Sequence, residues 1–261
     1  MFTVGGARPS AVGTYRKQDD INRIYSIAKT SYNKAKEALE LAHGMFYFRE
    51  DSAISDVIPG YKANQLKFGS YTKDNFAVLF VDMRGSTRRA ISVGEEQTFL
   101  TMHIYIPALL EVIKLYHGNV IDIMGDGLMV FFGGSKQDDN IMTKDVAIKN
   151  AAYCSLGMMT IKEKVINRIL NEEKMKWPNI SIGIGVTYGD VIVTKIGIND
   201  VYDVKAFGDC VNKASKYSGG DNKIHVSNTI RDKWPKGKDG TLKFIKSRSD
   251  DGYYVNYEGV V

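Results

Sequence analysis

The first regular pattern of apolar and polar positions lies near the N-terminus. Between Asp20 and Ala42, apolar side chains recur every three or four residues, and charged side chains occupy the other faces. This spacing predicts an amphipathic helix, which could dock on its own domain or pair with the same helix of a second subunit. Residues 1–19 show no periodicity and are interpreted as a loose arm. Residues 46–75 contain a Pro59-Gly60 turn signal and are interpreted as a connector.

From Phe76 onward the pattern alternates between strand and helix. The order β, α, β, β, α, β with additions predicts an α+β fold of the ferredoxin-like βαββαβ type, in which helices cover one face of a mainly antiparallel sheet. The expected elements are a strand at 76–82, a helix at 95–116 interrupted by Pro107, a strand pair at 118–132, a long helix at 142–176, a strand pair at 180–186 and 190–196 around Tyr188-Gly189, a short helix after Phe207, and late strands at 224–226, 242–245 and 253–257.

Composition adds limits to this picture. The 261 residues are 44% hydrophobic and 25% charged, which is typical of a globular protein. No apolar run approaches the ~20 residues that span a bilayer, and the first residues lack the order of a signal peptide. The two cysteines, Cys154 and Cys210, have no CxxC spacing. We therefore expect a cytoplasmic protein with reduced thiols and no transmembrane segment.

The net charge of +5 is small and spread along the chain. There are no aromatic strands of the RNA-binding type, no zinc-finger spacings and no long Lys/Arg runs. A small-molecule site is therefore favoured over nucleic-acid binding, and an RNA-binding ferredoxin-like module is a weaker hypothesis.

The candidate chemistry begins where the strand from Phe76 delivers Asp82, followed by Gly85-Ser86-Thr87. A carboxylate at a strand end and backbone N–H groups at a helix start suit a metal and a phosphate. The alternative is that Asp82 only caps a helix. A second acidic turn, Gly125-Asp126-Gly127, is fully explained as a hairpin turn on its own. The expected topology nevertheless places Asp126 beside Asp82, and paired carboxylates with substrate phosphates bind Mg²⁺.

Three stretches together resemble class III nucleotidyl cyclases: Phe80 to Thr87, Ile121 to Gly127 and Phe207 to Lys216. They occur in the order and spacing of that family, and the match runs from about Phe76 to about Tyr257. The resemblance implies that residues 76–261 form a cyclase catalytic domain after an N-terminal part at 1–75. It also implies a homodimer with its sites at the subunit interface.

The resemblance also implies site residues. Asp82, Asp126 and the Met83 carbonyl correspond to the ligands of two divalent metal ions, Mn²⁺ or Mg²⁺, and Asn212 to the residue that binds ribose. Attack of the 3′ hydroxyl on the α-phosphate of a nucleoside triphosphate would then release pyrophosphate. The backbone N–H groups of Arg84, Gly85, Ser86 and Thr87 would hold the β and γ phosphates.

One departure from the family concerns the transition-state arginine, four residues after Asn212, which is Lys216 here. Lysine supplies a point charge but not the bidentate fork of arginine. Alternatively, Lys216 is a solvated helix residue and another cation, such as Arg84 or Arg248, takes this role.

A second departure concerns the base. Adenylate cyclases carry a lysine and an aspartate or threonine at the positions of Asp122 and Lys205, so the acidic and basic residues are reversed here. An acceptor at Asp122 and a donor at Lys205 fit guanine or uracil, which offer a ring N–H beside a keto oxygen, rather than adenine. A plain Asp122–Lys205 salt bridge in an emptied pocket is the structural alternative.

The compact domain and the altered base pair resemble the bacterial pyrimidine cyclases of Pycsar anti-phage defence. That resemblance implies uridylate cyclase activity, UTP to 3′,5′-cyclic UMP, and a separate effector protein activated by the product. A cytidylate cyclase is the nearest alternative, because Asp122 could accept from the cytosine amino group. A guanylate cyclase comes next, and a catalytically silent nucleotide sensor is the alternative from another class.

Overall fold

The computed structural model describes residues 18–41, 58, 61, 66–134, 142–198, 201–234 and 243–257. The predicted arm and most of the predicted connector lie outside these ranges. The helices are α1 (Gln18–Glu40), α2 (Ser86–Val93), α3 (Glu95–Leu115), α4 (Lys144–Ile161), α5 (Arg168–Glu172), α6 (Asp209–Tyr217) and α7 (Asn228–Lys233), and a π-helical stretch, Lys162–Asn167, joins α4 to α5. The strands are β1 (Tyr71–Met83), β2 (Asn119–Met124), β3 (Gly127–Gly133), β4 (Ile182–Ile198), β5 (Val201–Phe207), β6 (Lys223–Val226), β7 (Lys243–Lys246) and β8 (Tyr253–Asn256).

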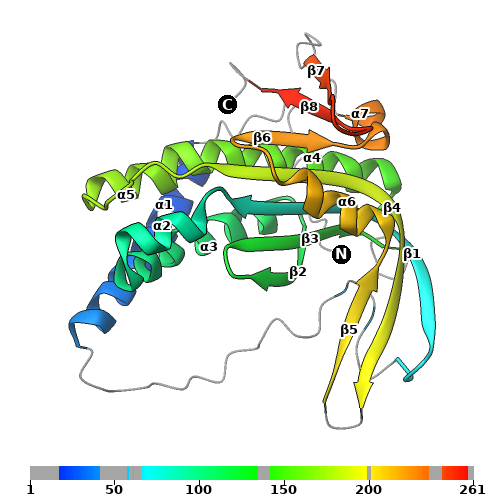
Figure 1. The fold of residues 1–261 in the computed structure, drawn as a ribbon, viewed down its shortest axis with the longest axis horizontal. Coiled ribbons are helices and arrows are strands. Elements are labelled where there is room, and N and C mark those ends of the chain that lie inside the picture. The colour runs from blue at the N-terminus through cyan, green and yellow to red at the C-terminus, as the bar shows by residue number, and fades with distance from the viewer. Residues whose placement is uncertain are drawn as a thin grey trace, which may run out of the picture.

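These strands form a single sheet in the order β2-β3-β1-β4-β6-β8-β7, with β5 paired to β4 (Figure 1). Neighbouring strands are antiparallel except β4 and β6, which are parallel. The longest pairing joins β1 to β4 and runs from Tyr71 opposite Thr194 to Met83 opposite Ile182. The predicted α+β fold with an N-terminal helix is confirmed.

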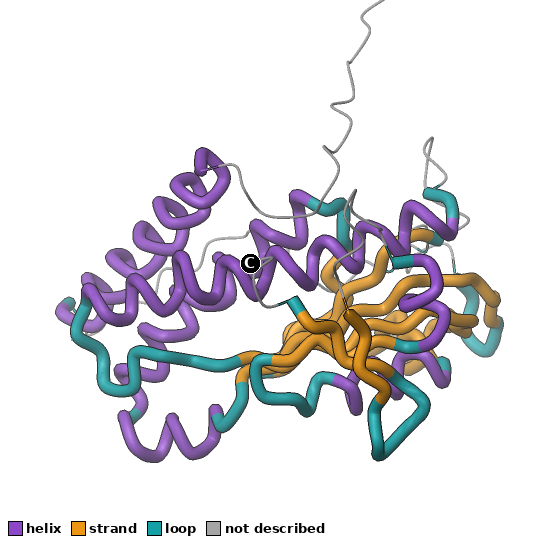
Figure 2. Tube along the Cα trace, turned by 90° about the horizontal axis from the view of Figure 1, so that it is seen from above, coloured by secondary structure: helices purple, strands orange, loops and turns teal. Residues whose placement is uncertain are grey.

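Helices cover the two faces of the sheet unequally. Alternate residues of β1 point to opposite faces, so Leu79 and Val81 enter a large core with α1, α3 and α4, whereas Phe76 and Val78 enter a smaller core with α6. Figure 2 shows the long helices gathered beside the layer of strands. The expectation that helices cover only one face is therefore wrong for α6.

The position of α6 depends on glycines in β4. A Cβ at Gly185 would lie 2.0 Å from the carbonyl oxygen of Ala214, and one at Gly183 would lie 1.8 Å from that of Ser218. Real Cβ atoms do not approach backbone this closely. The absence of side chains at these two positions lets α6 rest directly on the strand.

The predicted strand pair around Tyr188-Gly189 is wrong, because β4 runs unbroken through both residues. A Cβ at Gly189 would lie 3.0 Å from the Cβ of Cys210, at the start of α6. The glycine therefore marks a close approach of helix and strand and not a turn. The hairpin lies farther on, between Ile198 and Val201.

Helix α1 docks on its own chain. Ile24, Ala28 and Tyr32 are buried in the large core. Ion pairs join Arg23 to Glu111 of α3 and Lys29 to Glu173, just after α5. Of the two arrangements left open by the sequence, the structure shows the one within the chain.

Helix α3 is 21 residues long and apolar enough to cross a membrane by length and composition alone. It passes through Pro107 without ending. Its side chains at Ile104, Leu109 and Ile113 are buried in the large core, between the sheet and neighbouring helices. A core helix of a folded domain can have the length and apolar composition of a membrane-spanning helix, and the contacts of α3 are those of a core helix.

Candidate active site

The structure brings Asp82 and Asp126 together. Asp82 is the penultimate residue of β1, and Asp126 lies in the tight turn between β2 and β3. Because β3 pairs with β1, with Leu128 opposite Val81, the turn is held beside the end of β1. The backbone N–H of Met83 donates to Oδ2 of Asp126 over 3.2 Å. The pairing of the strands therefore brings the two carboxylates together, as the sequence predicted.

Burial and the neighbouring charge of Asp126 both act on the Asp82 carboxylate. Burial raises the pKa of Asp82, and the charge of Asp126 raises it further. Arg84 opposes this shift, since its Nη1 donates to Oδ2 of Asp82 over 2.8 Å, but it does not cancel it. The site therefore carries negative charge that a single arginine only partly neutralises.

A divalent cation fits this donor set. Within the described residues no group of three or more His, Cys, Asp or Glu side chains forms a closed metal site. Two carboxylates beside an open surface match the way Mg²⁺ is bound, with substrate oxygens completing the shell. The alternative in which Asp82 caps a helix is wrong, because the N-cap of α2 is Gly85.

A buried tyrosine lies near the two carboxylates. Tyr105 of α3 is fully buried, and its hydroxyl has no hydrogen-bond partner within the described residues. Burial raises its pKa, and the charges of Asp126 and then Asp82 raise it further. Sequence reasoning missed Tyr105, because a tyrosine inside an apolar helical stretch gives no separate signal.

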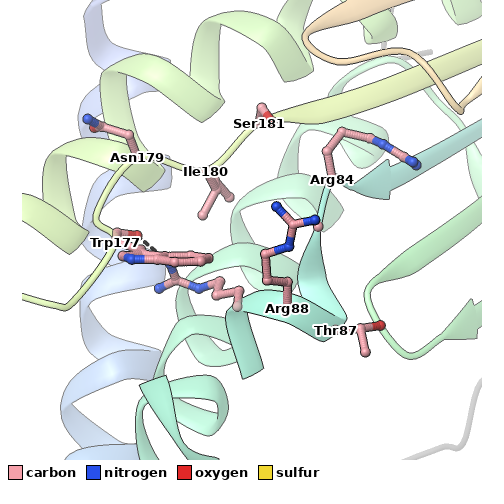
Figure 3. Close-up of a pocket in the computed structure, with 9 residues that line it drawn as sticks. Arg84, Thr87, Arg88, Trp177, Asn179, Ile180 and Ser181 are labelled. Carbon is pink, nitrogen blue, oxygen red and sulfur yellow. Dashed lines mark hydrogen bonds between the residues drawn. The ribbon is translucent and has the colours of Figure 1, made fainter. Parts of the chain in front are cut away.

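The predicted phosphate loop opens into a pocket. Gly85 adopts the left-handed conformation with φ 67°, and α2 starts after it without a side-chain cap. The first N–H groups of α2 are therefore available to an anion. A pocket of about 490 Å³ adjoins this loop and is lined by Arg84, Gly85, Thr87, Arg88, Arg89, Trp177, Asn179, Ile180 and Ser181 (Figure 3). Ser86 opens the helix but is not among these lining residues.

The α6 residues lie elsewhere in the chain. Asn212 and Lys216 are exposed, and within the described residues their side chains make no hydrogen bond or ion pair with Asp82 or Asp126. Thr187 donates to the carbonyl of Cys210 at the start of α6 and pairs with Val78 of β1. Val78 precedes Asp82 by four residues, or roughly 13 Å along a strand. The start of α6 therefore lies away from the carboxylates. The helix then runs along β4 toward Gly183, which pairs with Asp82, so its last turn, with Lys216, lies nearer to them.

The candidate base-reading residues lie on two outer strands. Asp122 is a half-buried residue of β2, and Lys205 is an exposed residue of β5. Nζ of Lys205 lies 2.6 Å from Oδ2 of Asp203. This bond is the main cause of a raised pKa at Lys205, to which the charge of Asp122 also contributes. The alternative of a direct Asp122–Lys205 salt bridge is wrong.

Asp203 was missed by sequence reasoning. It precedes Lys205 by two residues, which places both side chains on the same face of β5. That i, i+2 spacing in a strand was the available signal. Arg248, the other cation considered for the phosphate, is exposed in the bend between β7 and β8.

Comparison with known proteins adds to this geometry. The model of the adenylate and guanylate cyclase catalytic domain matches residues 68–243, two thirds of the chain. The chain belongs to this family. The match includes Asp82, Asp126 and Asn212 and excludes α1, which precedes it.

Individual relatives carry different substrate names. An adenylate cyclase of Anabaena cylindrica is 24% identical over 76% of this chain and 37% of its own length. A uridylate cyclase of Gulbenkiania mobilis is 28% identical over 67% of both chains. A cytidylate cyclase of Escherichia coli is 28% identical over 80% of this chain and 41% of its own length. The chain thus spans less than half the length of two of these three cyclases.

Solved structures support the fold. The adenylyl cyclase CyaB from P. aeruginosa superposes with a TM-score of 0.60 at 20% identity, covering 72% of this chain and 96% of that one. The class III cyclase fold is therefore shared.

Proposed function

We propose that the protein is a pyrimidine nucleotide cyclase that converts UTP into 3′,5′-cyclic UMP and pyrophosphate. The observation that carries the choice of base is the arrangement of Asp122 and Lys205. Uracil presents a ring N–H, which a carboxylate accepts, beside a keto oxygen, to which an ammonium donates. Asp203 holds the ammonium of Lys205 on β5, which reduces the rotamer freedom lost on binding. The uridylate cyclase relative is consistent with this choice.

The chemistry rests on Asp82 and Asp126. Their carboxylates, with the carbonyl of Met83, hold two divalent metal ions, Mn²⁺ or Mg²⁺. When bound, such ions lower the pKa of the ribose 3′ hydroxyl and neutralise the triphosphate. The 3′ oxygen forms a bond to the α-phosphorus, its proton passes to solvent, and the bond to the β-phosphate oxygen breaks with the electron pair leaving on pyrophosphate. The N–H groups following Gly85 orient the β and γ phosphates for this in-line step.

The separation of Asn212 from the carboxylates supports a homodimer. In the proposed dimer, Asn212 and Lys216 of the partner subunit complete the site, binding ribose and placing a positive charge near the α-phosphate. The exposed apolar side chains of Ile196, Ile198 and Tyr202 on the β4–β5 hairpin are suited to such an interface. Mixing inactive Asp82→Asn and Asn212→Ala proteins tests this: recovery of activity supports a composite site, and none opposes it.

The substrate assignment is tested by incubating the protein with each of the four nucleoside triphosphates and Mn²⁺ and separating the products by chromatography. Cyclic UMP is expected as the main product. Cyclic AMP as the main product would contradict the argument from Asp122 and Lys205. Nucleotide binding with no product from any triphosphate would support a nucleotide sensor instead.

Cytidylate cyclase activity is the second candidate, favoured by the Escherichia coli relative. Asp122 accepts equally from the amino group of cytosine, while Lys205 reaches N3 or O2. Cyclic CMP as the main product in the same assay would select it. A guanylate cyclase is the third candidate, and cyclic GMP as the main product in the same assay would select it.

The cyclic nucleotide then serves as a cytoplasmic messenger that activates a separate effector protein in anti-phage defence. The buried, unpaired thiols of Cys154 and Cys210 are consistent with a reducing compartment. Mass spectrometry of cells that express the protein tests this role. A rise in the cyclic nucleotide after phage infection is expected, and an unchanged level would oppose it.

A further inference from the structure

The pocket beside α2 is lined by three arginines, and two of them, Arg88 and Arg89, lie outside the motif at Asp82. Arg84, Arg88 and Arg89 all line it, and none of the described lining residues is a carboxylate. Its other lining side chains are neutral. A pocket with this charge pattern is suited to an anion of high charge density.

Arg89 supplies part of that charge from within the protein. It is only 5% exposed, and its guanidinium donates to two neutral groups, the carbonyl of Trp177 and Oγ1 of Thr101. Its Nε is buried and has no hydrogen-bond partner among the residues that the structure describes. A buried cation bonded only to neutral acceptors lacks a counter-ion, so an anion in the adjoining pocket lowers its energy.

Arg88 differs from Arg84 and Arg89 because its guanidinium is bonded to no other described residue. Arg84 is paired with Asp82, and Arg89 is fixed by Trp177 and Thr101. Arg88 is exposed and has no hydrogen bond or ion pair within the described residues. In Figure 3 its guanidinium extends from α2 into the space below Ser181 and Ile180. Its guanidinium N–H groups are therefore available as hydrogen-bond donors inside the pocket.

In the proposed function the β and γ phosphates of the substrate lie at the start of α2, and we propose that the Arg88 side chain, which the motif does not include, binds them directly. The inference rests on the proposed function, since it places the α-phosphate at Asp82 and the distal phosphates beyond Gly85. The open N–H groups at the start of α2 face the same anion. Arg88 makes charge-assisted hydrogen bonds to the β and γ phosphates and retains pyrophosphate after the bond to the α-phosphate breaks.

Equilibrium binding tests the proposal without requiring turnover. Isothermal titration calorimetry uses pyrophosphate in EDTA, so that binding reports on the arginines and not on a metal. Arg88→Ala is expected to weaken binding about 10- to 100-fold, because a bidentate charged pair is lost. Arg88→Lys is expected to weaken it less, since a point charge remains. Arg231→Ala, which removes an arginine on α7, serves as the matched control and is expected to leave binding unchanged.

The outcomes separate this inference from the cyclase assignment. Weaker pyrophosphate binding by Arg88→Ala, in a protein with a normal melting temperature, supports the pocket even if no triphosphate yields a cyclic product. Unchanged pyrophosphate binding by Arg88→Ala, in a protein whose wild type is an active cyclase, overturns it. Inorganic phosphate binding as tightly as pyrophosphate also overturns it, because the pocket would then select a single phosphate.

Discussion

The carboxylate end and the base-reading end of the candidate site are built differently. Asp82 and Asp126 are partly buried, one at the end of β1 and the other in the β2–β3 turn, and the pairing of β3 with β1 fixes their separation. Asp122 and Lys205 lie on outer strands, and Lys205 is oriented by one neighbour, Asp203. Chemistry that demands a fixed geometry is thus placed on the most constrained backbone, whereas base selection is left to side chains that can change without disturbing the fold.

The strongest test of this contrast is at the carboxylate end. Asp126→Asn keeps the shape of the side chain but removes a charged oxygen ligand, so kcat is expected to fall about 10³-fold or more. The melting temperature of the metal-free protein is expected to hold or rise, because the repulsion of Asp82 is relieved. Asp221→Asn, at an exposed site, is the control. Activity above a tenth of wild type would remove Asp126 from the metal site.

The base-reading end is tested by Lys205→Ala. The ratio of kcat/KM for UTP to that for the other triphosphates is expected to fall about 10- to 100-fold, because a donor to the base is lost. Stability is expected to be unchanged, since Lys205 is exposed. Lys73→Ala, which removes an exposed lysine from β1, is the matched control. An equal loss for every triphosphate would show that Lys205 does not read the base.

A smaller effect is expected beneath the carboxylates. Tyr105→Phe removes a buried hydroxyl that has no partner in the described part of the chain, so the metal-free protein is expected to gain about 1 kcal/mol of stability and to melt about 2–4 °C higher. Thermal unfolding in EDTA measures this. A lower melting temperature would show that the hydroxyl already makes a stabilising bond.

The smallest effect concerns the C-terminal strands, outside both ends of the site. His225 is buried between the rings of Tyr217 and Tyr254, at 3.8 and 4.4 Å, and its Nε2 lies 3.0 Å from Asp250. Burial lowers the pKa of His225 and outweighs the charge and hydrogen bond of Asp250 and the charge of Asp251, which raise it. The charge of Lys246 lowers it further.

Because the folded state holds this proton less tightly than the unfolded state, stability is expected to fall as the pH drops below about 6.5. The loss stops once the pH passes below the pKa of the folded protein. His225→Gln is expected to flatten this part of the stability curve measured by urea unfolding, and His117→Asn, at an exposed position, is the control. An unaltered slope in His225→Gln would contradict the assignment.

The same contrast explains what the sequence could predict. The motif at Asp82 is local, since a strand, an acid and a glycine turn follow one another, and the structure keeps that order. Tyr188-Gly189 was misread because a glycine required by a helix above the sheet has the same sequence signature as a glycine in a turn.

Other features required packing that no local pattern records. Arg88 and Arg89 follow the motif as ordinary polar positions of a helix, and only the approach of Trp177 and Ser181 turns them into the wall of a pocket. Tyr105 is likewise set apart only by its lack of a partner. The roles of Asn212 and Lys216 remain predictions, because within the described residues neither side chain bonds to Asp82 or Asp126.

The close packing of α6 on Gly183 and Gly185 limits which sequence changes the protein can tolerate during evolution. In a library of all single substitutions, we expect these two positions to accept glycine alone, because even alanine would collide with helix backbone. Lys205 and Asp203, by contrast, can vary with little cost to folding. A few mutations can therefore change which base the protein prefers. The residues that position α6, by contrast, can hardly change at all.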